Sequence, residues 1–136
     1  MRINLTRALF LSISIVFFIS SCKKSADNSK LQTLMIDYSN SGKTIKVSRG
    51  QIINLTLGNP GDGGYVFDAP EYNSKVLSLI ANTHQPPISN AIGDFGKDIW
   101  QFKALASGSS NLTITATRSF DKNNPVVMFS GTIAVN

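Results

Sequence analysis

The stretch Asn111-Leu-Thr-Ile-Thr-Ala-Thr117 alternates apolar and polar side chains from end to end. Successive side chains of a β-strand point to opposite faces, so this alternation predicts a strand with one buried face. The segment Asp98-Ile-Trp-Gln-Phe-Lys103 has the same period, with Trp100 and Phe102 on its apolar face. We therefore predict two strands here and assign Trp100 and Phe102 to the core.

Outward from these two strands, the period of two recurs along the chain. Two more predicted strands each gather apolar side chains and Gly131 on one face: Ile53, Leu55 and Leu57, and Phe129, Gly131, Ile133 and Val135. Shorter predicted strands cover residues 31–38, 43–47, 65–68 and 76–82. No segment shows the sustained apolar repeat of a helix. Many short strands between Gly, Asn, Asp and Pro turns predict an all-β fold, an immunoglobulin-like antiparallel β-sandwich.

The N-terminus has the pattern of a secretion signal. Arg2 and Arg7 precede an apolar run over residues 8–19, and small residues then lead to Cys22. The run is short for a permanent membrane span, and a lone Cys after small residues resembles the lipobox of bacterial lipoproteins. We therefore expect residues 1–21 to be a lipoprotein signal peptide and Cys22 to carry lipid. An ordinary secreted protein and an uncleaved anchor are the alternatives.

The remainder of the chain has the size of one domain. Cys22 is the sole cysteine, so a lipidated Cys22 excludes a disulfide framework, a thiolate metal site and a cysteine nucleophile. Residues 22–30 are polar and without period, which predicts a flexible tether. Residues 31–136 suffice for one β-sandwich with its own core. We expect a monomer in the cell envelope, lipid-anchored to a bacterial membrane and either periplasmic or surface-exposed.

The formal net charge of +5 belongs mostly to the N-terminal segments. From residue 31 onward, the chain has eight Lys or Arg residues and seven Asp or Glu residues, so this part is nearly neutral. The basic excess includes Lys23 and Lys24, which can meet anionic lipid head groups. A nucleic-acid binder shows a basic stripe with interleaved aromatic residues, and this domain has none. We therefore expect no nucleic-acid partner.

The residues also argue against an enzyme. The one histidine, His84, has no partner at metal-binding spacing, and no G-x-S-x-G elbow is present. We expect His84 to be a solvated loop residue. Asp94 and Asp98 lack the oxygen-rich pattern of a calcium loop. The sequence thus predicts neither catalysis nor a metal or cofactor, and it leaves binding through the loops of a sandwich.

Three short segments between predicted strands are candidates for such binding. The first is rich in glycine, which allows entry into a narrow cleft, although Asp62-Gly63 is also a strong hairpin signal. The second is a polar, glycine-containing turn. The segments are Asn59-Pro60-Gly61-Asp62-Gly63-Gly64-Tyr65, Gly93-Asp94-Phe95-Gly96 and Arg118-Ser119-Phe120.

The third segment has two interpretations. An aromatic residue beside an Arg is the usual composition of an interface anchor. Alternatively, Arg118 pairs with a surface acid such as Asp121 while Phe120 caps the core. Under either interpretation, we expect residues 121–125 to form a polar loop after this segment.

In order and spacing, the three segments resemble the loop motifs of the chagasin family of cysteine-protease inhibitors, written NPTTGY, GxGG and RPW. The positions that match are Asn59, Pro60, Gly64, Tyr65, Gly93, Gly96 and Arg118. The first loop departs at residues 61–63, which replace two threonines and add one residue. Phe95 stands where a glycine is expected, and Ser119 and Phe120 replace Pro and Trp. The resemblance covers about residues 43–135.

The resemblance implies reversible inhibition of papain-like cysteine proteases. The first loop would cover the catalytic Cys and His of the protease, with Asp62 facing the imidazolium or serving only as a turn residue. The second loop would pair its backbone with the cleft wall, where Phe95 either fills a pocket or blocks the approach. Because one fold hosts many functions, an immunoglobulin-like adhesive or assembly module of the cell envelope is the alternative.

Overall fold

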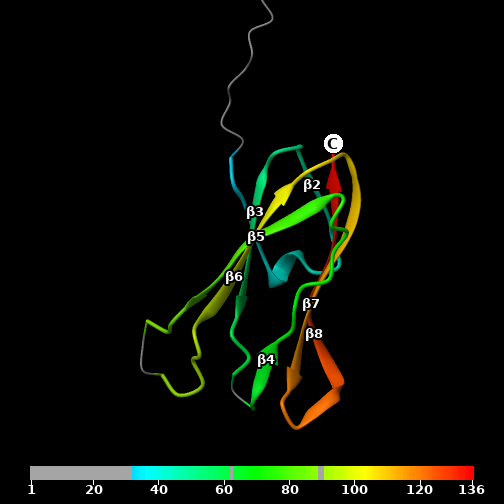
Figure 1. Cartoon of the computed structure of the whole chain (residues 1–136). Coiled ribbons are helices and arrows are strands. Elements are labelled where there is room, and N and C mark those ends of the chain that lie inside the picture. The colour runs from blue at the N-terminus through cyan, green and yellow to red at the C-terminus, as the bar shows by residue number, and fades with distance from the viewer. Residues whose placement is uncertain (1–31, 62, 89–90) are drawn as a thin grey trace, which may run out of the picture.

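Two four-stranded sheets pack face to face in the computed structural model, which describes residues 32–61, 63–88 and 91–136 (Figure 1). The predicted signal peptide, Cys22, the tether and Asp62 lie outside these residues. No described helix is long and apolar enough to cross a membrane. The strands are β1 (Leu34–Asp37), β2 (Thr44–Val47), β3 (Ile52–Gly58), β4 (Tyr65–Phe67), β5 (Leu77–Gln85), β6 (Lys97–Ala104), β7 (Gly108–Arg118) and β8 (Asp121–Val135), with a short 3-10 helix η1 (Tyr38–Asn40) after β1.

The strand order confirms the predicted β-sandwich and corrects its pairing. One sheet has the order β1-β3-β6-β5 and the other β2-β8-β7-β4. β1 pairs with β3, and β2 with β8, in parallel, so the sheets are mixed rather than purely antiparallel. For β1 and β3, the reason is that the chain crosses between the sheets twice near its start, from β1 to β2 and then to β3. Such a crossover brings a strand back in the same direction, which a tight hairpin cannot do.

The core lies between the sheets and follows the predicted alternation. Trp100 and Phe102 are fully buried on β6, and the ring of Phe67 meets Trp100 edge-on with centroids 4.7 Å apart. On β8, a β-carbon at Gly131 would lie 3.1 Å from Cζ of Phe129, so the glycine leaves room for that buried ring. The buried core comprises Ile36, Ile45, Val47, Ile53, Leu55, Leu57, Val76, Leu77, Trp100, Phe102, Ala104, Leu112, Ile114, Phe129, Ile133 and Val135.

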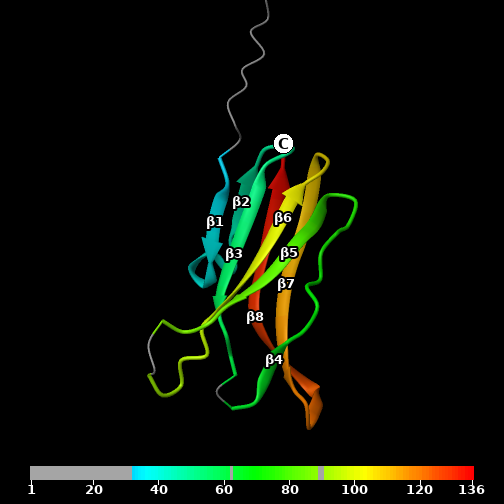
Figure 2. The same cartoon turned by 60° about the vertical axis from the view of Figure 1, so that its left-hand side comes forward.

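Two strand pairs extend beyond this core toward one end of the molecule (Figures 1 and 2). The strand predicted at residues 76–82 continues to Gln85, so His84 lies in β5 and not in a loop. The polar loop predicted at residues 121–125 is likewise wrong, because these residues begin β8. Both extensions are largely exposed, so no buried face imposes an alternation that the sequence could reveal. Pro125 lies in the stretch of β8 opposite the register shift between Ala116 and Arg118, a place that a residue without an N–H can occupy.

Candidate functional site

The three predicted segments lie side by side at one end of the sandwich, opposite the blue start of the described chain and the C-terminus (Figures 1 and 2). Loop 1, residues 59–64, connects β3 to β4. Loop 2, residues 86–96, connects β5 to β6, and loop 3, residues 119–120, connects β7 to β8. Loop 1 lies between the other two in both views. Segments that are far apart in sequence therefore form one surface.

Loop 1 crosses from one sheet to the other. β3 and β4 belong to different sheets, so the alternative in which Asp62-Gly63 closes a hairpin is wrong. The backbone N–H of Gly61 donates to Oδ1 of Asn59 over 2.9 Å, and the N–H of Gly64 donates to the carbonyl of Gly61 over 3.0 Å. Loop 1 is thus bent by its own hydrogen bonds and is not extended.

Asn59 fastens loop 1 to the neighbouring strand. Its Nδ2 donates to Oδ2 of Asp98 over 2.7 Å, and its backbone N–H donates to the carbonyl of Gly96 over 2.9 Å. The Asp98 side chain is 13% exposed, and the same oxygen lies 3.3 Å from Nδ1 of His84. Asp98 therefore links β5, β6 and loop 1. Sequence reasoning considered Asp98 only as a cation ligand and missed this role.

Loop 2 meets loop 1 through Phe95. A β-carbon built on Gly61 would lie 2.8 Å from Cδ1 and 2.9 Å from Cγ of Phe95, so the ring occupies the space beside Gly61. The ring remains 44% exposed. The neighbouring Gly96 has φ of 78°, and a β-carbon there would overlap the carbonyl oxygen of Gln85. Glycine is therefore required at Gly96, whereas the described contacts give Gly93 and Asp94 no comparable tie to loop 1.

Arg118, the last residue of β7, lies near the aromatic rings of Tyr65 in β4 and Phe120 in loop 3. The guanidinium carbon of Arg118 lies 4.4 Å from the ring centroid of Tyr65 and 5.7 Å from that of Phe120. Phe120 is 77% exposed, so the alternative in which it caps the core is wrong. Arg118 faces Asp121 in the β-register, but the described residues show no ion pair between them. Ser119 is exposed at the turn.

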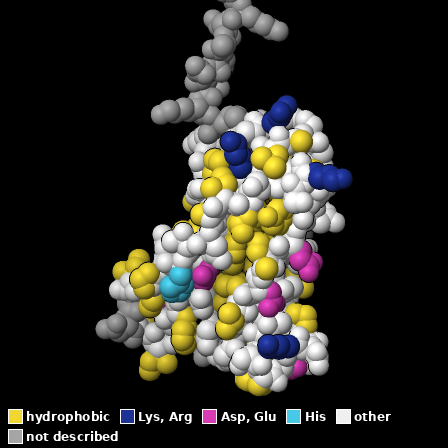
Figure 3. Space-filling model, in the orientation of Figure 1, with side chains coloured by type: hydrophobic (Ala, Val, Ile, Leu, Met, Phe, Trp, Pro, Cys, Tyr) yellow, Lys and Arg dark blue, Asp and Glu magenta, His cyan; other side chains and the backbone are white. Residues whose placement is uncertain are grey.

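Phe120 also reaches loop 1, on the flank opposite Phe95. A β-carbon at Gly64 would lie 3.8 Å from Cε1 of Phe120. Loop 1 is therefore bracketed by two partly or largely exposed aromatic rings. We call the described residues of the three loops, together with Tyr65 and Arg118, the wedge. Figure 3 shows hydrophobic side chains at this end as well as along the middle of the face in view.

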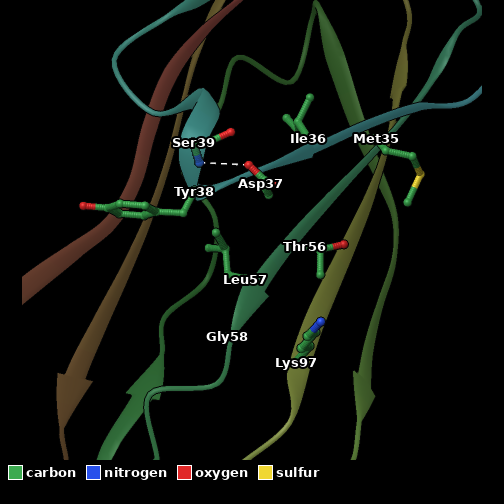
Figure 4. A pocket seen from close by; sticks show the side chains of 9 residues that line it. All are labelled: Met35, Ile36, Asp37, Tyr38, Ser39, Thr56, Leu57, Gly58 and Lys97. Atoms are coloured by element: carbon green, nitrogen blue, oxygen red, sulfur yellow. Dashed lines mark hydrogen bonds between the residues drawn. The ribbon is translucent and has the colours of Figure 1, made fainter.

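One hollow lies away from the wedge tip, along the edge strand β1, and another of similar volume lies beside loop 1, lined by Asn59, Gly61 and Tyr65 among others. The hollow along β1 has a volume of about 510 Å³ and runs from Met35 to Gly58 and Lys97. Figure 4 shows the carboxylate of Asp37 at its margin, accepting a hydrogen bond of 2.8 Å from the N–H of Ser39. Hydrogen bonding from the Ser39 side chain, and next from its backbone N–H, lowers the pKa of Asp37 below its usual value. Within the described residues, no three His, Cys, Asp or Glu side chains gather where they could hold a metal ion.

Known proteins share both the sequence pattern and the fold. The family model described as Chagasin family peptidase inhibitor I42 matches residues 46–133, more than half of the chain. The cysteine protease inhibitor EhICP2 from Entamoeba histolytica is similar, with 17% identity, a TM-score of 0.64, and coverage of 76% of this chain and 95% of that chain. The solution structure of amebosin is similar with 21% identity and a TM-score of 0.50, covering 77% of this chain and 99% of that chain. No curated protein matches the sequence.

Proposed function

The chain belongs to the chagasin family of peptidase inhibitors, and from this premise we propose that it reversibly and non-covalently blocks the cleft of papain-like cysteine proteases. As a member of an inhibitor family, the chain is not an enzyme. The wedge supplies the contact surface in this proposal. The observation that carries it is the meeting of three motif-bearing loops from separate parts of the chain at one end of the sandwich.

The hydrogen bonds within and between the loops favour tight docking. Binding costs free energy when mobile loops must be ordered, so loops that are already fixed lose less on association. Asn59 fixes loop 1 through Asp98 and through the carbonyl of Gly96. Phe95 and Phe120 pack against loop 1 from its two flanks. One copy of the chain carries the whole surface, which agrees with action as a monomer.

In the proposed complex, loop 1 lies over the catalytic Cys and His of the protease. The turn closed by Gly64 N–H and the Gly61 carbonyl bends the backbone, so loop 1 does not present an extended peptide bond aligned for attack. No covalent bond forms, and the inhibitor leaves intact. Loops 2 and 3 hold the walls of the cleft on either side, with Phe95 and Phe120 as the large side chains.

A titration of residues 31–136 against papain and several related cysteine proteases tests the proposal. We expect inhibition that reverses on dilution, with the inhibitor recovered at its original mass. Absence of inhibition at micromolar concentrations against every protease in the set would reject the proposal. The cell-envelope adhesive or assembly module would then be the better account of this fold.

The proposal places the inhibitor in the cell envelope, held by lipid on Cys22 and either periplasmic or surface-exposed. Its support is the N-terminal sequence pattern. The described chain starts at the end of the sandwich opposite the wedge (Figure 1). A tether that enters at Gln32 leaves the wedge facing away from the membrane, where an approaching protease can meet it.

A further inference from the structure

The ring of Phe95 fills the space into which a side chain at Gly61 would project. The nearest atoms to a β-carbon at Gly61 would be Cδ1 and Cγ of Phe95, at 2.8 and 2.9 Å, and Oδ1 of Asn59, at 3.0 Å. Carbon atoms in van der Waals contact lie about 3.5–4.0 Å apart, so even a methyl group at Gly61 would displace the ring. Because Cγ joins the ring to its stem, rotation of the ring about the Cβ–Cγ bond does not relieve this contact, so the whole side chain or loop 1 must shift.

The two positions also differ together from the motif pattern that the chain resembles. The motifs place hydroxyl side chains at the tip of the first loop and glycine at the position of Phe95. In this chain the first-loop tip has Gly61 and the second loop has Phe95. This chain thus has no side chain at Gly61 and a large ring at Phe95, and the two positions are in contact.

We propose that Phe95 is a specificity-determining residue of the wedge, which locks loop 2 to loop 1 through Gly61 and offers its exposed ring to an apolar wall of the protease cleft. This inference rests on the proposed function. The ring is 44% exposed, so it is neither a core residue nor free of the protein. A glycine in its place would let the cleft wall pair with bare backbone, whereas Phe95 requires an apolar depression in the target.

A double-mutant cycle tests the lock without requiring any protease. Gly61→Ala, Phe95→Ala and the double variant are compared by urea unfolding of residues 31–136. We expect Gly61→Ala to be more harmful with Phe95 present than in the Phe95→Ala background, where the methyl group has room, because contacting residues couple. The new methyl group also comes close to Oδ1 of Asn59, but it does so with and without Phe95, so this contact cancels from the coupling energy. Additive effects of the two substitutions would overturn the lock.

The same variants test specificity through their inhibition constants for papain and related proteases. We expect Gly61→Ala to raise the inhibition constant about tenfold with Phe95 present and less than about threefold in the Phe95→Ala background. Phe95→Leu should retain binding to the best-inhibited protease, whereas Phe95→Gln, of similar size, should weaken it. Equal effects of Leu and Gln, or an equal loss against every protease, would overturn the apolar-wall assignment.

Gly58→Ala is the matched control for Gly61→Ala. Gly58 is the last residue of β3, and a β-carbon there has no neighbour within 4 Å. Its substitution should leave both unfolding and inhibition unchanged. If the wild-type domain inhibits no protease, the specificity assignment fails with the proposed function, and the unfolding cycle still decides whether Gly61 and Phe95 are locked together.

Discussion

At the scale of single residues, the wedge depends on a few contacts between loops. Asn59 is held by Asp98, Gly61 accommodates Phe95, and Arg118 lies near the rings of Tyr65 and Phe120. These side chains lie outside the hydrophobic core, whose burial contributes most of the favourable free energy of folding. We therefore expect their removal to weaken inhibition more than it lowers the free energy of unfolding.

Phe120→Ala should weaken inhibition by about 2 kcal/mol, the loss expected for truncating a central aromatic anchor. The free energy of unfolding should change less, because the side chain is 77% exposed. Inhibition constants and urea unfolding of the same preparation check both statements. If the substitution instead costs roughly 3–5 kcal/mol of unfolding free energy, Phe120 is a packing residue and loop 3 has no binding role.

Asp98→Ala should loosen loop 1, because Nδ2 of Asn59 then loses its acceptor. Leaving such a partly buried donor unpaired costs about 1–3 kcal/mol. The inhibition constant should rise, while Asp98→Asn, which keeps an acceptor oxygen for Asn59, should restore most of the affinity. Equal affinity for the Ala and Asn variants would show that the bond to Asn59 does not position loop 1.

At the scale of elements, the sequence predicts strands well where one face is buried. The alternation over residues 111–117 lies within β7, and that around Trp100 lies within β6. The exposed halves of β5 and β8 escaped prediction, because solvent on both faces removes the alternation. Parallel pairing was also missed, since it depends on how the chain crosses between sheets and not on the residues within a strand.

The candidate site was predicted as three motifs but not as a set of contacts. The motif matches named Asn59 and Gly96, and the structure joins them by a hydrogen bond. Asp98 was missed because an acid in an alternating strand is expected to face solvent. The partner that makes its burial acceptable, Asn59, is 39 residues away in sequence. No local pattern contains that information.

Lengthening loop 1 by two glycines between Gly63 and Gly64 should weaken inhibition. A longer loop costs more to order, and it separates the turn residue Gly61 from Gly64. Inhibition titrations of the insertion variant check this. Lys43→Ala and Lys46→Ala are controls, because these positions lie at β2, away from the wedge.

The two lysine variants should keep the inhibition constant within a factor of about three. A loop-lengthened protein that inhibits as well as the wild type would contradict a role for loop 1 in the cleft. Equal weakening by the insertion and by the lysine substitutions would indicate a general loss of folding.

At the scale of the whole molecule, the two ends of the sandwich have different roles in this account. The described chain starts at one end, shown in blue, and the wedge occupies the far end (Figure 2). The core between them is complete within the described residues, with Trp100, Phe102 and Phe129 fully buried. We therefore expect membrane attachment and inhibition to be separable.

Cys22→Ser should release the protein from membranes without unfolding the domain. Each buried methylene of a lipid chain contributes roughly 0.8 kcal/mol of membrane affinity, so losing the acyl chains removes nearly all of it. Membrane fractionation checks the release, and urea unfolding checks the domain. A Cys22→Ser protein that still pellets with washed membranes after signal cleavage would count against lipid anchoring.

The central claim is that the wedge occupies the substrate cleft of a papain-like protease. The most direct measurement is the inhibition of papain by residues 31–136 at a series of substrate concentrations. The account predicts competitive inhibition: the apparent inhibition constant rises linearly with substrate concentration, and the maximal rate is unchanged. An inhibition constant independent of substrate concentration, or no inhibition of papain and its relatives at micromolar inhibitor, would contradict it.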